Sequence, residues 1–358
     1  MLRFTVLRFL LPATLLFHGA PSLAKFEDPL ITPARQTQRL TSSPMTAVVN
    51  AGGGRLVAAG WRGLIAVSED AGKTWRQAAV PVREDLTALA FPTPTHGWAV
   101  GNDGVVLEST DGGLTWVKRL DGNAAARLMA NKYEKLSEQN PSDVKLKAAL
   151  KDARDYLTQA PARPFLDIAF QNEQVGYLVG TFGMIFRTSD GGKTWEPLIE
   201  KTDNPDGYNI YCVRIVGDDV FLVGELGLAL RLDRGTGQFV KMSVPYDGSM
   251  FALGGNASSL VAAGLRGNAF LSSDDGTGWK KIEFGAGKPA TVASVAMIGD
   301  RTIALATLSG DLLISTDAGQ SFHRAQIKAP MKYAGIARAG ANDVVVVGLQ
   351  GIRIETIK

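Results

Sequence analysis

The chain has 358 residues, of which 45% are hydrophobic and 20% are charged, and this is enough apolar material for a large buried core. Its formal charge is +3, falling to +1 if Arg3 and Arg8 are removed, so the bulk charge gives no reason to expect a nucleic-acid partner. The single cysteine, Cys212, excludes an internal disulfide, and we expect it to be a small buried hydrophobe. The 40 glycines indicate frequent turns and favour an all-β architecture.

Residues 1–24 have the pattern of a secretory signal peptide. Two arginines precede an apolar stretch, residues 9–17, that is too short to cross a bilayer. Ser22 and Ala24 then supply small residues at positions −3 and −1 of a cleavage site. We therefore predict export to the periplasm, cleavage after Ala24 and no direct membrane insertion of the remaining chain. The alternative is an uncleaved membrane anchor.

The strongest signal in the remaining chain is an internal repeat. The pattern S/T-x-D-x-G-x-T-W occurs at residues 68–75, 109–116 and 188–195, and weaker copies occur at 272–279 and 315–322. A degenerate copy runs from Asp233 through Gly235 to Phe239. This is the Asp box of BNR repeats, and it has the chemistry of a hairpin turn. The aspartate can accept hydrogen bonds from turn N–H groups, the glycine permits a positive φ, and the aromatic residue packs between units.

We assign a structural role to these boxes. The residues concerned are Asp70, Trp75, Asp111, Trp116, Asp190, Trp195, Asp274, Trp279, Asp317 and Phe322.

A second motif, G-x-x-G followed by an apolar stretch, precedes each box by about ten residues. Such a pair predicts a tight turn between two strands, and it is not a phosphate loop because no helix follows it. The pairs begin at Gly60, Gly101, Gly180, Gly224, Gly264 and Gly348, with a variant from Thr307 to Gly310.

Seven such units with a period near 40 residues predict a seven-bladed β-propeller over residues 25–358, with four strands in each blade. The last unit has no Asp box and is one strand short. We expect residues 34–40 to supply that strand and so to close the ring.

The interval between the second and third Asp boxes, from Trp116 to Trp195, is about 40 residues longer than one repeat. The excess is residues 122–161. It predicts an α-helical hairpin between blades 2 and 3, with helices near residues 124–138 and 141–158. Asn140 is the expected N-cap of the second helix, with Pro141 at its first position. Apolar residues at helical spacing form a stripe at Leu146, Leu150, Ala153 and Leu157.

The Gly pairs and the insert should converge on one face of the propeller, opposite the Asp boxes. Tight turns usually carry polar residues, yet most of these carry an apolar or basic one. Aromatic residues and arginine are frequent at protein interfaces, so we predict a partner-binding surface. Its residues are Trp61, Arg62, Phe182, Leu226, Leu265, Arg266, Leu308 and Leu349. The alternative is that these side chains fold over the insert or over one another.

The catalytic motifs are weak, so we predict that the chain is not an enzyme and needs no cofactor or metal. After cleavage only His96 and His323 remain, neither in a metal-binding spacing. Asp boxes also occur in sialidases, but the F-R-I-P signature of that family is absent. A glycosidase would need two carboxyls roughly 5–9.5 Å apart, and Asp103 and Glu225 are the candidates on the predicted face.

The repeated combination of Gly pair, apolar strand and D-G-G-x-T-W behind a signal peptide resembles the Ycf48-like propellers, a family that includes photosystem II assembly factors and relatives in non-photosynthetic bacteria. The resemblance covers about residues 36–358. It implies a non-catalytic scaffold that docks on the extracytoplasmic part of a membrane protein complex, for example a transporter of the RND or MMPL type. The alternatives are a sialidase-like or other glycosidase, and a propeller that binds a small ligand or a glycan.

Overall fold

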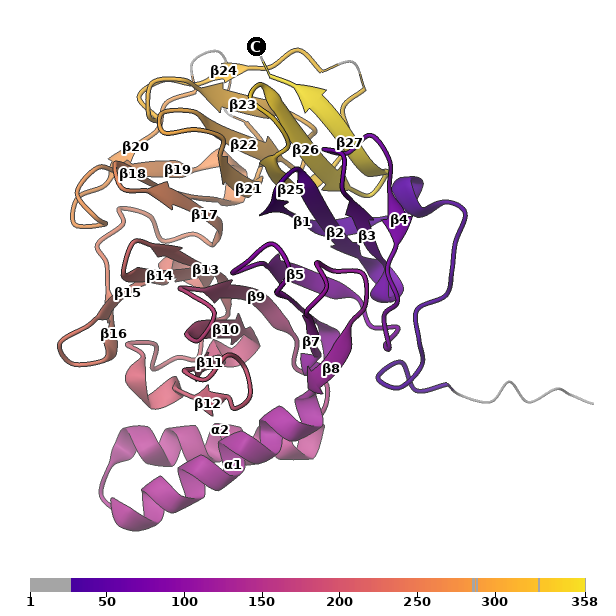
Figure 1. Ribbon diagram of the computed structural model, residues 1–358. Coiled ribbons are helices and arrows are strands. Elements are labelled where there is room, and N and C mark those ends of the chain that lie inside the picture. Colours follow the sequence, from indigo (N-terminus) through magenta and orange to yellow (C-terminus); the bar gives the residue numbers. More distant parts are fainter. Residues whose placement is uncertain (1–26, 285–286, 288, 328, 358) are drawn as a thin grey trace, which may run out of the picture.

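Seven antiparallel sheets stand in a ring in the computed structural model, which describes residues 27–284, 287, 289–327 and 329–357 (Figure 1). Six of the sheets have four strands and the last has three. The predicted seven-bladed propeller is therefore confirmed. The predicted signal peptide lies outside the described residues.

Each blade is a simple meander whose strands pair in chain order. The first four blades contain β1 (Met45–Gly52), β2 (Arg55–Gly60), β3 (Ile65–Ser68), β4 (Arg76–Gln77); β5 (Leu86–Ala90), β6 (Gly97–Gly101), β7 (Val106–Ser109), β8 (Val117–Leu120); β9 (Phe165–Phe170), β10 (Gly176–Gly180), β11 (Ile185–Thr188), β12 (Glu196–Pro197); and β13 (Ile210–Val216), β14 (Asp219–Gly224), β15 (Ala229–Asp233), β16 (Gln238–Lys241). The last three contain β17 (Met250–Asn256), β18 (Ser259–Gly264), β19 (Ala269–Ser272), β20 (Lys280–Lys281); β21 (Val292–Met297), β22 (Ile303–Thr307), β23 (Leu312–Ser315), β24 (His323–Arg324); and β25 (Tyr333–Arg338), β26 (Asp343–Gly348), β27 (Gly351–Thr356).

Apolar clusters between neighbouring blades hold the ring together. One cluster joins Val57 and Val67 of the first blade to Leu89 and Leu107 of the second, and it includes Trp116, which is 4% exposed. One sheet alone cannot bury both of its faces, and stacking the sheets around an axis solves this problem. The box tryptophan thus packs between two blades.

The closing of the ring differs from the prediction. Residues 34–40 form no strand in the last blade. Instead the Ala34 N–H donates to the Val80 carbonyl at 3.0 Å, and the Thr37 N–H donates to the Gln77 side chain at 2.9 Å, so this segment follows the first blade. The segment is too polar to place alternate side chains in a core, and its Leu40 alone packs against Val347 and Ile352 of the last blade.

First and last blades also meet at their innermost strands, β1 and β25. The Asn50 side chain donates to the Arg338 carbonyl at 2.8 Å across this junction. The ring is therefore closed by packing and side-chain hydrogen bonds rather than by a shared sheet.

Glycine is required at both ends of a Gly-pair turn. A Cβ at Gly60 or Gly101 would collide with the backbone carbonyl of Pro44 or Asp85, just before the innermost strand. The second glycine, as at Gly63 with φ +72°, adopts the left-handed conformation that side chains disfavour. These turns lie between the second and third strands of each blade.

Asp boxes lie between the third and fourth strands, at the opposite end of the blades. In the box of blade 2, Asp111 accepts the Leu114 and Thr115 N–H groups at 3.0 Å and the Thr115 hydroxyl at 2.6 Å. The Trp116 indole donates to the Gly113 carbonyl at 2.8 Å. In the first box, hydrogen bonds from the Thr74 side chain and backbone hold the pKa of Asp70 at about 2.

The insert is a hairpin of α1 (Gly122–Gln139) and α2 (Val144–Gln159), as predicted, but α2 begins three residues later than expected. Its N-cap is Asp143, which accepts the N–H groups of Lys145 at 2.8 Å and Leu146 at 3.1 Å. Asn140 instead ends α1, because its N–H donates to the Leu136 carbonyl. Asn140 is thus the C-cap of α1 rather than the N-cap of α2 that the local sequence motif predicted.

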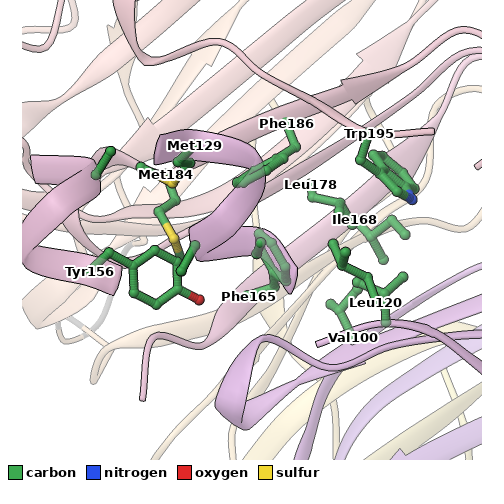
Figure 2. Close-up of a cluster of buried hydrophobic side chains, with 14 of the residues drawn as sticks. Val100, Leu120, Met129, Tyr156, Phe165, Ile168, Leu178, Met184, Phe186 and Trp195 are labelled. Carbon is green, nitrogen blue, oxygen red and sulfur yellow. The ribbon is translucent and has the colours of Figure 1, made fainter. Parts of the chain in front are cut away.

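Figure 1 shows the hairpin at the outer rim of blades 2 and 3, away from the central opening. Figure 2 shows Met129 and Tyr156 of the hairpin beside Phe165 and Phe186 of blade 3. All four side chains are fully buried. The hairpin is thus part of the core, and no helix among the described residues is long and apolar enough to cross a membrane.

Candidate docking face and central channel

Gly-pair turns present the predicted partner-binding residues at one end of the propeller, here called the Gly-pair face. Five of the turns are short 3-10 helices: η2 (Trp61–Gly63), η3 (Asn102–Gly104), η4 (Thr181–Gly183), η6 (Glu225–Gly227) and η7 (Leu265–Gly267). The six apolar side chains predicted for the surface are 36–57% exposed, so none of them is buried in the core. They are Trp61, Phe182, Leu226, Leu265, Leu308 and Leu349.

The middle residue of these five turns has a left-handed backbone although it is not glycine. It is Arg62, Asp103, Phe182, Leu226 or Arg266, with φ between 48° and 57°. A side chain in this conformation costs about 1–2 kcal/mol, and such strain tends to persist where the side chain has a use. The turns therefore hold these side chains at the surface against a local backbone preference.

The next blade stabilises four of the five strained turns, and sequence reasoning missed this. The Arg62 N–H donates to the Asp85 carboxylate at 2.7 Å, and the Phe182 N–H donates to the Asn209 side chain at 2.8 Å. Ser249 and Thr291 accept in the same way from Leu226 and Arg266. Each acceptor is the residue directly before an innermost strand. An Asp, Asn, Ser or Thr at that position is the sequence signal that could have predicted these hydrogen bonds.

Arg163 connects the insert to the Gly-pair face. Its guanidinium lies 4.7 Å from the centre of the Tyr156 ring and 4.4 Å from that of Phe182, and it pairs with Asp152 at 2.9 Å. Arg163 is 3% exposed, whereas Phe182 is 52% exposed. The base of the insert and the turn of blade 3 thus form one continuous surface.

A second set of contacts fixes α1 to the exit of blade 3, at η5 (Ile199–Lys201). The Tyr133 hydroxyl donates to Glu200 at 2.7 Å and accepts the Ile199 N–H at 2.9 Å. Lys132 pairs with Glu200 at 2.8 Å and with Glu196 at 3.0 Å. These contacts attach the hairpin to blade 3 of the propeller.

Two grooves lie beside these elements. One, of about 700 Å³, lies between residues 29–44 and the first blade, and Trp61, Arg62, Arg35 and Arg83 are among its lining residues. The other, of about 710 Å³, separates the insert from the ends of blades 3 and 4, with Leu136 and Val240 in its wall.

The structure gives the glycosidase alternative little support. Asp103 and Glu225 lie on η3 and η6, which belong to blades 2 and 4. Burial and the Asp28 charge raise the pKa of Asp103, and burial with neighbouring carboxylates raises that of Glu84 to about 7. Among the described residues, no group of His, Cys, Asp and Glu is arranged to hold a metal ion.

The central channel is the other concave site. In all seven blades the innermost strand has an irregular register at its second residue, which has no partner in the ladder. These residues surround a cavity of about 160 Å³ and are Thr46, Thr87, Leu166, Tyr211, Phe251, Ala293 and Ala334.

An ion pair lies within this channel. Arg214 Nη1 is 2.6 Å from Asp167 Oδ2 and also donates to the Val213 carbonyl at 2.6 Å. Tyr211 and Phe251, with ring centres 5.0 Å apart, line the same cavity. Cys212 beside them is 2% exposed, and burial raises the pKa of its thiol to about 12, so it is a buried hydrophobe as expected.

Residues 53–138 and 156–262, more than half of the chain, match the family described as "Photosynthesis system II assembly factor YCF48". The chain belongs to this family. The gap in the match, residues 139–155, falls within the helical insert.

Two relatives illustrate the extent of the similarity. A photosystem II assembly protein Ycf48 of Synechococcus sp. (strain JA-2-3B'a(2-13)) is 34% identical over 137 residues, which are 36% of this chain and 41% of that protein. A photosystem II assembly lipoprotein Ycf48 of Prochlorococcus marinus is 23% identical over 60% of this chain and 79% of its own length. The first match thus spans about two fifths of that relative.

A solved structure described as YCF48 bound to D1 peptide superposes with a TM-score of 0.61 at 17% identity, covering 89% of this chain and 94% of that one. At this identity the similarity shows the fold alone. Both named relatives are assembly proteins, and the family membership agrees with a scaffold rather than with a glycosidase.

Proposed function

We propose that this chain is a non-catalytic exported scaffold that docks on the extracytoplasmic part of a membrane protein complex. The docking surface is the Gly-pair face together with the helical insert. The observation that carries the proposal is the ring of exposed apolar side chains and arginines on the Gly-pair turns, five of which have a strained backbone. Relatives named as assembly proteins, and a family structure with a bound peptide, support the same role.

The distribution of exposed apolar residues supports this choice of face. Of thirteen large apolar side chains that are exposed among the described residues, six lie in Gly-pair turns. Three more, Leu128, Val144 and Leu157, lie on the insert. Apolar residues gathered in this way are typical of protein interfaces, and the two grooves beside them offer room for segments of a partner.

The identity of the partner belongs to the same proposal. The relatives are named for photosystem II, and one of them is named a lipoprotein, which is in keeping with a location outside the cytoplasm. For this chain we propose a periplasmic location and a membrane complex as partner. A transporter of the RND or MMPL type is the specific partner that the family resemblance implies.

Photo-crosslinking from single positions tests the proposed surface. A photo-crosslinking amino acid at position 226, in η6, should capture a membrane protein in intact cells, and the captured protein is identified by mass spectrometry. The same amino acid at position 117, an exposed valine on β8 near the Asp-box end, is the matched control. Equal capture from both positions, or from 117 alone, would contradict the proposal.

Substitutions complete the test. Trp61→Ala with Arg62→Ala, and Val144→Glu with Leu157→Glu, should each reduce co-purification of the captured protein while the thermal midpoint stays close to that of the wild type. Removing the whole insert is unsuitable, because it would uncover Phe165 and Phe186 of blade 3. Val117→Ala should leave co-purification unchanged.

Leu226→Gly is the sharpest variant. It relieves about 1–2 kcal/mol of backbone strain and adds about 0.5–1 kcal/mol of chain entropy to be lost on folding. Its stability should therefore equal or slightly exceed that of the wild type, while docking weakens. Unchanged docking in this variant and in both double variants would exclude the Gly-pair face as the partner surface.

A further inference from the structure

The central cavity has the size of one aromatic ring. Its volume is about 160 Å³, and an engineered protein cavity of ~150 Å³ holds one benzene molecule. Four of its seven ring positions are Ala or Thr, namely Thr46, Thr87, Ala293 and Ala334. These short side chains leave the space open on one side, while Tyr211 and Phe251 bound it on another.

Arg214 presents hydrogen-bond donors that the described part of the protein does not use. Both of its hydrogen bonds to described residues leave from Nη1, so Nη2 and Nε make none with the described part of the chain. Its side chain is 38% exposed, whereas that of Asp167 is 9% exposed. A guanidinium with a free edge is suited to hold a carboxylate through two parallel hydrogen bonds.

Asp167 serves to orient this arginine. Its Oδ2 accepts the Val213 N–H at 2.9 Å as well as the arginine, and its Oδ1 accepts the Ile168 N–H at 2.9 Å. The carboxylate therefore has partners on both oxygens. Because it is held by backbone groups of β9 and β13, it fixes one edge of the Arg214 guanidinium.

The irregular register around the channel supplies further polar groups. A residue left out of the ladder keeps backbone groups that the sheet does not pair. The seven residues of this kind all line the cavity. In two of them, Thr46 and Thr87, the hydroxyl donates to the backbone carbonyl that begins the next blade's innermost strand, at Leu86 and Phe165.

We propose that the central channel binds a carboxylate attached to a ring-sized apolar group. Arg214 holds the carboxylate, and Tyr211 and Phe251 contact the apolar group. The ligand is either a free aromatic acid or the C-terminal carboxylate of a polypeptide that ends in an aromatic residue. This site is separate from the docking surface and does not depend on it.

Fluorine NMR with 4-fluorobenzoate as the probe tests the site. The wild-type protein should broaden the probe signal, with a dissociation constant in the millimolar range, and benzoate should reverse the broadening while the uncharged benzamide should not. Arg214→Met should weaken binding roughly tenfold or more, as loss of charged hydrogen bonds does. Arg231→Met is the control, because Arg231 also pairs with an aspartate, Asp219, but does not line the channel.

Ala293→Phe provides a second test that leaves the ion pair intact. The added ring should fill the cavity and abolish binding. The proposal is wrong if the wild type does not broaden the probe, if benzamide competes as well as benzoate, or if a folded Arg214→Met or Ala293→Phe protein binds normally. A peptide acid ending in phenylalanine, compared with its amide, distinguishes the two ligand sources: competition by the acid alone identifies a polypeptide C-terminus, and no competition by either identifies a free acid.

Discussion

Single residues in the Gly-pair turns show how side chains are displayed at the expense of local backbone preference. Phe182 and Leu226 keep φ values of 56° and 48° that glycine would adopt without strain. Asn209 and Ser249 of the following blades accept their N–H groups and so offset part of the strain. Such residues are expected to contribute to surface recognition more than to stability.

Glu84 gives a pH dependence that belongs to one residue. Burial, with the Asp103, Asp85 and Asp28 charges, raises its pKa from 4.5 to about 7. The folded chain therefore holds this proton where the unfolded chain has lost it. The contribution of this proton to the stability of the folded chain is complete below pH 4.5 and is lost as the pH rises through 7.

Glu84→Gln should remove this dependence, since glutamine is neutral at every pH. We expect the thermal midpoint of the variant to exceed that of the wild type above pH 7 and to approach it below pH 4.5. The measurement is thermal unfolding across this range, with the exposed Glu138→Gln as control. A difference that is independent of pH would contradict the assignment.

Among the elements, we expect the Asp-box hairpins to stabilise the blades and the Gly-pair turns to present the proposed docking surface. The two sets lie at opposite ends of the sheets, because one joins the third and fourth strands and the other joins the second and third. The box carboxylates have low pKa values, as at Asp190, where hydrogen bonds from Thr194 hold the pKa at about 2. A change in a box should therefore affect stability and leave docking unchanged.

Trp116→Ala should lower the free energy of unfolding by about 3–5 kcal/mol, because a large buried ring between two blades is lost. Asp111→Ala should cost about 1–3 kcal/mol by leaving turn N–H groups unpaired. Denaturant unfolding of each variant and of the wild type measures both changes in the free energy of unfolding. Either variant, while folded, should capture the partner normally; loss of capture without loss of stability would place the boxes in the docking surface.

At the scale of the whole molecule, the segment before β1 adds to the contacts that close the ring. The last blade has three strands, and Leu40 of η1 (Leu40–Ser42), 8% exposed, packs beside Ile352 and Val347 at its edge. A closed ring needs the first and last blades to stay together, because each blade buries its faces only against its neighbours.

Leu40→Ala should therefore destabilise the closing junction first. We expect a loss of about 2–5 kcal/mol, as for other buried leucines, and faster hydrogen exchange in β25–β27 and β1 than in β9–β16. Hydrogen exchange followed by mass spectrometry measures both regions in one experiment. Ile31→Ala, at a residue that is 72% exposed, is the control. Uniform acceleration around the ring would show that closure does not depend on Leu40.

The repeat determined much of this protein without any tertiary information. Motifs such as residues 109–116 have a local physical meaning, a hairpin turn with defined hydrogen bonds, so their number and spacing predicted seven blades and the position of the insert. The repeat also predicted that the apolar turn residues are exposed, because a tight turn at the end of a blade has few neighbours to cover it.

Tertiary structure alone decided which distant groups meet. Asp167 and Arg214 lie 47 residues apart, on β9 and β13, and neither has a local pattern that marks it. The missing strand of the last blade predicted that residues 34–40 would supply it, but the backbone N–H groups of Ala34 and Thr37 donate to the first blade instead. Local motifs specify the blades because their contacts lie within a few residues, whereas the channel and the closure depend on contacts between blades that only the completed ring brings together.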